Sequence, residues 1–282
     1  MAIAVGLVRR FRVGDPRIQV IEVIAGQTLD RLARAEQHAN RGEVLAEMAV
    51  VEQSDGRIVV AEQRRDEATG QNLAVLSGLY EAVPAIPWPE LPDGGLTDAQ
   101  CRAWMPPVAY ERVLGGTGRF LSELRPVTAL FLNFSGIDYD GDDEAGARLD
   151  AYIRWVQGVL RRHGGSLFQL TMGDKGSYFC AAFGAPIAHD DDETRAVYAA
   201  LDLQSPPPEL AFVSGIRTGI AQGLMRTGAY GGGTRHIYSI QGDSANLAAR
   251  LMMAAKEGIL CDSTVYQAAR GRVPMEPLPP IP

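Results

Sequence analysis

RHIYSIQGDSANLAAR (235–250) is the stretch that decides the fold, because its residue pattern changes from that of a strand to that of a helix. The first six residues alternate as a polar strand does, Gln241-Gly242-Asp243 interrupts them, and a helix follows. On that helix Asn246 and Arg250 are four residues apart and therefore share a face. An amide and a guanidinium directed at one point suit a phosphate ester. The alternative is an ordinary amphipathic helix with a solvated arginine.

The same helix carries an apolar stripe beside that polar pair. Leu247 and Leu251, extended by Ala254, have the spacing of one helical face. We expect this stripe to face the core.

Composition limits the possible classes of protein. The chain has 282 residues, 46% hydrophobic and 22% charged, which is enough for a sizeable core and about two domains. A net charge of −7 and a pI near 5.2 argue against a nucleic-acid partner or an anionic membrane surface. The three cysteines are far apart and have no CxxC spacing, which is typical of free thiols in a reducing cytoplasm. No apolar run approaches the roughly 18 residues of a membrane span.

Three regions follow one another along the chain. Residues 1–80 contain a predicted helix over 27–40 and predicted strands over 44–51 and 57–62. Residues 81–122 are rich in proline and paired glycine, so we predict a linker there. The third region is 123–282.

The third region alternates strand and helix patterns regularly. Its first strand has no charged residue and is therefore expected to be central in a sheet. Gly231-Gly232-Gly233 lies between two predicted strands, which favours a hairpin turn over a phosphate loop. The order β-α-β-β-α-β predicts an α+β sandwich of ferredoxin-like type. The predicted strands are 127–134, 166–172, 177–183, 212–225, 234–240 and 259–261, and the helices are 148–163 and 189–204.

Several catalytic signatures are missing from the sequence. There is no GxxxxGK[ST], HExxH or GxSxG, and no zinc-spaced Cys/His set. The four histidines are scattered and are interpreted as surface or capping residues.

Five segments of the third region resemble one family when they are taken in order. Together they are similar to the catalytic homology domain of class III nucleotidyl cyclases, in particular to the second homology domain of the soluble, bicarbonate-responsive adenylyl cyclases. The segments are LFLNFSGID (130–138), HGGSLFQLTMGDKGSYFCAAFGAP (163–186), HDDDETRAVYAAL (189–201), GIRTGIAQG (215–223) and YSIQGDSANLAARLM (238–252).

The N-terminal region resembles the same family. Residues 13–45 are similar to the closing half of a first homology domain, with a strand, a glycine turn and a helix. Aligned as an internal repeat, Asp30 falls opposite Asn246 and Arg34 opposite Arg250. The resemblance implies that the chain is a fragment of a larger tandem cyclase, with residues 1–80 ending its first homology domain.

The resemblance also implies roles for particular residues. In this family ATP lies between two paired homology domains, and two carboxylates of one domain hold two Mg²⁺ (or Mn²⁺). The other domain supplies an asparagine that orients the ribose and an arginine that stabilises the α-phosphate, here Asn246 and Arg250. The adenine-selecting lysine falls at Gln169, or at Leu170 in the other alignment, and its partner at Ser239. For both base-facing positions the alternative is an ordinary strand residue at a domain interface.

The metal-binding pattern is incomplete. The first strand of the family ends in a metal-binding aspartate, but Asn133 stands there, and only Asp174 remains as a vestigial candidate. A neutral amide is a poor ligand for a hard dication. We therefore expect Mg²⁺ or Mn²⁺ to be held mainly by residues outside this chain, in the first homology domain of the same parent protein. The isolated chain should then be inactive.

Two functions are compatible with these features. The first is part of an adenylate cyclase that converts ATP to cyclic AMP and pyrophosphate for intracellular signalling. The second is a catalytically silent pseudo-cyclase domain that dimerises or senses nucleotides. The sequence leaves the preference between ATP and GTP open.

Overall fold

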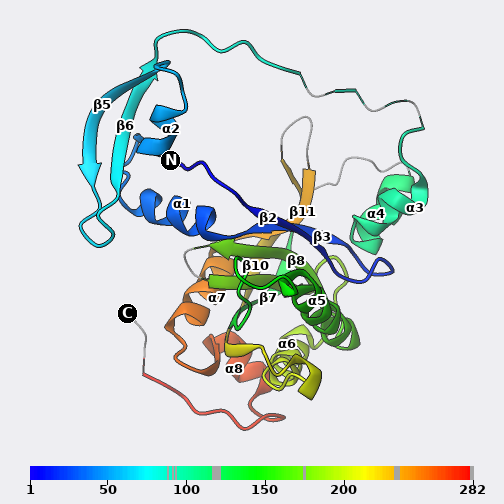
Figure 1. The fold of residues 1–282 in the computed structure, drawn as a ribbon. Coiled ribbons are helices and arrows are strands. Elements are labelled where there is room, and N and C mark those ends of the chain that lie inside the picture. The colour runs from blue at the N-terminus through cyan, green and yellow to red at the C-terminus, as the bar shows by residue number, and fades with distance from the viewer. Residues whose placement is uncertain are drawn as a thin grey trace. The chain divides into compact units, whose positions relative to one another are not determined.

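The computed structural model describes residues 1–87, 89–90, 92, 94–115, 122–173, 176–231 and 236–279, without the side chains of residues 112, 113 and 236. The chain forms two compact units (Figure 1). Unit 1 comprises residues 1–11 and 24–95 with the end of strand β8. Unit 2 comprises residues 12–23, 96–171 and the described chain from residue 176 onward.

Unit 2 contains the predicted β-α-β-β-α-β order. The elements are β7 (Glu123–Ser135), α5 (Ala145–Arg162), β8 (Ser166–Gly173), β9 (Gly176–Phe183), α6 (Asp192–Leu203) and β10 (Ser214–Gly231). The four strands lie in the order β10-β7-β9-β8, so the first and third strands are the central pair. This is the ferredoxin-like arrangement, and the predicted fold class is confirmed.

Two further strands extend this sheet from β10. Strand β11 (His236–Gln241) pairs antiparallel with β10 and forms the predicted hairpin, although Gly232 and Gly233 lie outside the described residues. Strand β12 (Gly258–Cys261) pairs parallel with β10. Two short helices that were not predicted, η1 (Pro208–Leu210) and α8 (Ser263–Ala269), also belong to this unit.

Strand β7 lies between β10 and β9, and both of its faces are covered. On one face the Phe134 ring packs against Tyr152 of α5, with ring centroids 4.7 Å apart. On the other face Val127 and Ala129 cluster with Ala245 and Ala248 of α7 (Asp243–Ala254). A strand buried on both faces has no place for a charged side chain, which explains its apolar sequence.

Helix α7 packs mainly with its alanines and Met252, and only Leu251 of the predicted leucine stripe reaches the core. Its buried residues are Ala245, Ala248 and Met252, whereas Leu247 is 38% exposed. Ala254 is exposed as well, and Leu251 is only partly buried. The expectation was therefore wrong for Leu247 and Ala254, while Leu251 packs against the core as predicted. The reason lies in β10, the strand that α7 covers.

That strand presents two glycines to the helix, one to its backbone and one to the side chain of Ser244. A Cβ at Gly219 of β10 would lie 2.1 Å from the carbonyl oxygen of Ala248, and a Cβ at Gly223 would lie 2.1 Å from Oγ of Ser244. Such a close approach leaves room only for small side chains in the interface. The periodicity of α7 alone did not indicate whether its alanines or its leucines would pack against these glycines.

Unit 1 is a small sheet with two helices. Its strands are β1 (Ala2–Ile3), β4 (Val44–Glu47), β6 (Asn72–Leu79) and β5 (Ile58–Arg65), in that spatial order. Helix α1 (Gln27–Gln37) was predicted, but the strand predicted over 44–51 ends at Glu47 and continues as helix α2 (Met48–Glu52). The core of the unit is Ala35, Leu45, Leu73 and Val75.

The repeat predicted from the sequence has the same local structure in both copies. Strands β2 (Arg9–Val13) and β3 (Ile21–Ala25) form a two-stranded sheet, and β3 passes through Gly26 into α1. In the same way β11 passes through Gly242 into α7. In both copies the residue that caps the helix is a glycine without a side-chain cap.

The predicted linker is partly helical. Residues 81–87 are exposed and have no regular structure. Helices α3 (Asp98–Ala103) and α4 (Pro107–Leu114) follow, and α3 begins with a capping box of Thr97 and Gln100. Proline is compatible with the first position of a helix, where no N–H is needed, so the prolines did not exclude these helices. No helix in the described part of the chain is long and apolar enough to cross a membrane.

Candidate active site

Asn246 and Arg250 project from the outer side of α7. Both side chains are exposed, and within the described residues neither makes a hydrogen bond or an ion pair. The helix that carries them is held against β10 by Gly219 and Gly223. Among the described residues the pair is therefore an unpaired amide and an unpaired guanidinium on a helix that packs closely against β10.

The two base-facing candidates lie on different strands. Gln169 of β8 is exposed, and its Nε2 donates a hydrogen bond to Oγ1 of Thr171 at 3.0 Å. Leu170, the other alignment, is only 7% exposed. Ser239 of β11 is half-buried and lies opposite Gly228 of β10. The structure records no contact that joins Gln169, Ser239, Asn246 and Arg250, so their grouping stays a prediction.

Asn133, at the position of the family's metal ligand, is buried between two strands. In the register of the sheet it lies opposite Arg217 of β10 on one side and Tyr178 of β9 on the other. Nη2 of Arg217 donates to its Oδ1 at 2.8 Å, and its Nδ2 donates to the carbonyl oxygen of Ser177 at 3.2 Å. Asn133 is 2% exposed, so these bonds satisfy a polar group that burial would otherwise penalise.

These contacts do not fit a divalent cation at Asn133. The oxygen that would have to ligate the ion already accepts from a guanidinium, which is itself a cation. Asp174 lies outside the described residues. Among the residues that the structure describes, no group of three His, Cys, Asp or Glu side chains could hold a metal ion. The surroundings of Asn133 therefore do not fit Mg²⁺ or Mn²⁺.

Arg217 and Tyr139 are neighbours of this position that were not predicted from the sequence. The Tyr139 hydroxyl lies 2.9 Å from Oγ of Ser177, and burial raises the pKa of Tyr139 to about 12. A lone arginine in the otherwise uncharged segment GIRTGIAQG was the available signal. Its partner could be identified only once the strand register was known.

A cavity of about 320 Å³ lies away from all of these residues. It is lined by the start of β7, from Arg125 to Thr128, and by the start of α6 near His189 and Asp192. Nδ1 of His189 lies 3.1 Å from Oδ1 of Asp192. None of the predicted site residues lines this cavity, so it does not contribute to the candidate active site.

The α+β sheet with strand order β10-β7-β9-β8 defines the fold, and comparison with known proteins identifies the class of its relatives. No family model matches the chain. The chain is 36% identical over 152 residues to human adenylate cyclase type 10, a match that covers 53% of this chain and 9% of that protein. The chain thus spans less than a tenth of the length of this relative.

Solved structures of cyclases are also similar to the chain. The adenylyl cyclase CyaB from P. aeruginosa is 22% identical, with a TM-score of 0.46 over 54% of this chain and 83% of that chain. The guanylate cyclase domain of RhGC from Catenaria anguillulae is 23% identical, with a TM-score of 0.47 over 54% of this chain and 86% of that chain. The homologues named adenylate cyclase type 10 confirm the resemblance to a class III cyclase that the sequence motifs predicted.

Proposed function

We propose that this chain supplies the transition-state half of a class III adenylyl cyclase site, which converts ATP to cyclic AMP and pyrophosphate. The observation that carries the proposal is the exposed Asn246–Arg250 pair on a helix fixed by backbone packing. The 36% identity to an adenylate cyclase over about half of the chain supports it.

The two side chains would act by position and charge. Arg250 would meet the negative charge that develops on the α-phosphate, and Asn246 would orient the ribose. Because α7 is held against β10, both groups would be in place before the substrate binds. No proton transfer by either group is required.

The second half of the site would come from another homology domain. The polar contacts of Asn133 support this division, since Arg217 takes the oxygen that a metal would need. Mg²⁺ or Mn²⁺ would be held by carboxylates of that partner domain. In this proposal residues 1–80 end a first homology domain, 81–122 link it, and 123–282 form the second, all in the cytoplasm.

Base selection would involve Gln169 and Ser239. Gln169 is exposed while Leu170 is buried, which supports the alignment that places Gln169 in the purine pocket. A neutral amide can present either its oxygen or its nitrogen, so we propose ATP as the main substrate with some acceptance of GTP.

One observation favours a second candidate function. The Asn133–Arg217 contact leaves this domain without a metal ligand at that position, as expected of a silent pseudo-cyclase domain that pairs with others or senses nucleotides. In that case Asn246 and Arg250 would have no catalytic role.

Arg250→Ala separates the two candidates. In a protein that pairs this domain with a metal-holding homology domain, the variant should lower kcat on the order of 10²–10³-fold with little change in KM, since a transition-state contact is lost. Arg161→Ala, which removes an exposed arginine from α5, is the matched control and should leave kcat unchanged. A change in KM alone, or no change, would contradict the role of Arg250.

A further inference from the structure

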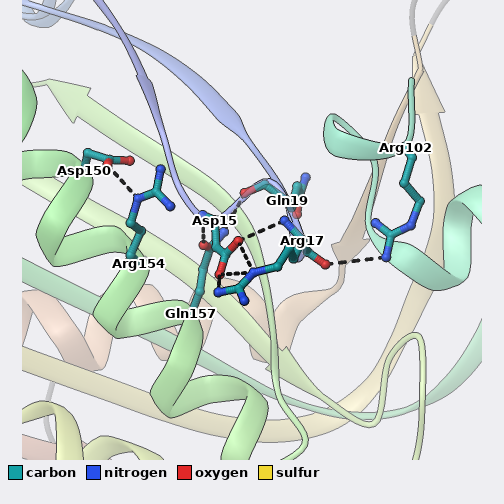
Figure 2. A network of polar contacts seen from close by, with 7 residues as sticks. All are labelled: Asp15, Arg17, Gln19, Arg102, Asp150, Arg154 and Gln157. Carbon is teal, nitrogen blue, oxygen red and sulfur yellow. Dashed lines mark hydrogen bonds and ion pairs between the residues drawn. The ribbon is translucent and has the colours of Figure 1, made fainter. Parts of the chain in front are cut away.

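Residues 12–23, called the arm below, form the tip of the β2–β3 hairpin and belong to unit 2. The chain on either side of the arm, up to Phe11 and from Ile24, belongs to unit 1. The arm therefore leaves one unit, enters the other and returns. Its contacts within unit 2 form the network in Figure 2, with α5 on one side and Arg102 of α3 on the other.

The surface of α5 that receives the arm has regular helical spacing. Asp150, Arg154 and Gln157 stand at positions i, i+4 and i+7 and share one face. Oδ1 of Asp150 accepts from the N–H of Gly14 at 2.8 Å, while its Oδ2 accepts from Nε of Arg154 at 2.6 Å. Arg154 thus holds the carboxylate that binds the arm.

Gln157 binds the arm with both ends of its amide. Its Oε1 accepts from the N–H of Asp15 at 2.8 Å, and its Nε2 donates to the carbonyl oxygen of Gln19 at 2.7 Å. Gln157 is 2% exposed, and both of these bonds are partly buried. On the opposite side the N–H of Val20 donates to the carbonyl oxygen of Ala103 at 2.6 Å.

The arm keeps its own shape through a second set of bonds. Asp15 accepts from the N–H groups of Arg17, Ile18 and Gln19, and pairs with the Arg17 guanidinium at 2.7 Å. The Arg17 guanidinium, together with the Arg17 N–H, bonds the carboxylate and lowers the pKa of Asp15 to about 2, whereas Ile18 and Gln19 donate to the main-chain carbonyl oxygen of Asp15. Every main-chain N–H from Gly14 to Val20 consequently has an acceptor, either inside the arm or on unit 2. A stably docked loop requires that its main-chain N–H groups are hydrogen-bonded in this way.

Gly14 is required by the same geometry. Its φ is +106°, and a Cβ there would lie 2.4 Å from the carbonyl oxygen of Gln19 and 2.9 Å from Nε2 of Gln157. A side chain at this position would push the arm away from the residue that binds it.

We propose that the arm is a docking element through which the region before the linker binds the surface made by α5 and α3, with Gln157 as the anchor. This docking deepens the proposed function. It rests on that function only in so far as the two regions are taken to be homology domains. The partner that this surface accepts is a hairpin tip with a Gly-Asp-Pro turn, recognised mainly through its main chain.

Cleavage of the linker in the folded full chain tests this. A specific protease site inserted after Val83, in the exposed segment 81–87, allows the purified protein to be nicked into two pieces without disturbing the arm. Association is then measured by size-exclusion chromatography and native mass spectrometry. No nucleotide is needed, so a failure of the proposed catalytic role would not affect the result.

The nicked wild type should remain one complex. Gln157→Ala and Gly14→Ala should each weaken the association about a hundredfold, as expected for the loss of two partly buried hydrogen bonds. Gly14→Ala alters the piece that does not carry α5, so it excludes misfolding of α5 as the cause. Gln204→Ala, which removes an amide bond to Thr218 elsewhere in unit 2, is the matched control and should leave the complex intact. Dissociation of the nicked wild type, or variants that bind as tightly as the wild type, would overturn the proposal.

Discussion

Asn133 differs from the aspartate of the family pattern by one group, yet its surroundings have adapted to the amide. Arg217 donates to the amide oxygen, and the Ser177 carbonyl oxygen accepts from the amide nitrogen. A carboxylate could accept from Arg217 but could not donate to Ser177. The position is therefore built around an amide, and restoring the acid alone would not restore a metal site.

Asn133→Asp should yield a buried ion pair with Arg217 and no gain in Mn²⁺ affinity. Coupling it with Arg217→Gln removes the competing cation, so the double variant should bind Mn²⁺ more tightly than the single variant. Titration of Mn²⁺ followed by electron paramagnetic resonance measures both affinities. Arg217→Gln alone is the control. Equal Mn²⁺ affinity in the single and double variants would show that Arg217 does not block the site.

Gln169→Lys should raise the preference for ATP over GTP in the paired enzyme. A lysine ammonium can donate to N1 of adenine, whereas N1–H of guanine is itself a donor and would face another donor. The values of kcat/KM for both nucleotides, in wild type and variant, give the ratio. Leu170→Met, at the buried alternative position, is the control. An unchanged ratio for Gln169→Lys would remove Gln169 from the purine pocket.

At the scale of elements, the position of α7 depends on the glycines of β10. Gly219→Ala should lower the free energy of unfolding by about 1–3 kcal/mol, because the added methyl meets helix backbone and not a movable side chain. Urea denaturation measures the change.

Gly158→Ala on α5 is the control for that substitution. Gly158 is exposed, and no heavy atom lies within 4 Å of the added Cβ. The change should stabilise the chain by about 0.5–1 kcal/mol, since alanine favours a helix interior. If Gly219→Ala were as stable as the wild type, the close contact of α7 with β10 would be wrong.

The order of elements in unit 2 was predictable from the sequence because each element buries a face with a clear period. Strand β7 shows its central place by having no charge over 127–134. The buried stripe of α7 was not predictable, since alanines and leucines have similar periods and the choice depended on Gly219 of a distant strand. The second half of the strand predicted over 44–51 is helix α2, because a short apolar run does not by itself distinguish a strand from a helix.

The candidate site was predictable only in part. Asn246 and Arg250 could be identified from spacing and resemblance, and the structure shows them exposed on one helix. The contact between Asn133 and Arg217 could not be identified from the sequence. The two residues are 84 positions apart and meet only through the register of β7 and β10. The arm contacts of Gln157 were missed for the same reason, since they join residues 138 and 142 positions apart.

At the scale of the whole molecule, the two units differ in what they could contribute. Unit 2 carries the exposed Asn246–Arg250 pair, while its position for a metal ligand is occupied by an amide and a guanidinium. The repeat in unit 1 has Asp30 and Arg34 at the corresponding places on α1. On this account neither unit forms a complete site, and activity requires a domain that holds the metal ions.

Formation of cyclic AMP is the measurement that tests this account most directly. The isolated chain, a metal-holding cyclase homology domain and their mixture are each incubated with ATP and Mg²⁺ or Mn²⁺. Little or no cyclic AMP is expected from either component alone, whereas the mixture should be active and should lose on the order of 10²-fold or more of its rate with Arg250→Ala. Robust conversion of ATP by the isolated chain would contradict the account, as would a mixture whose activity does not depend on Arg250.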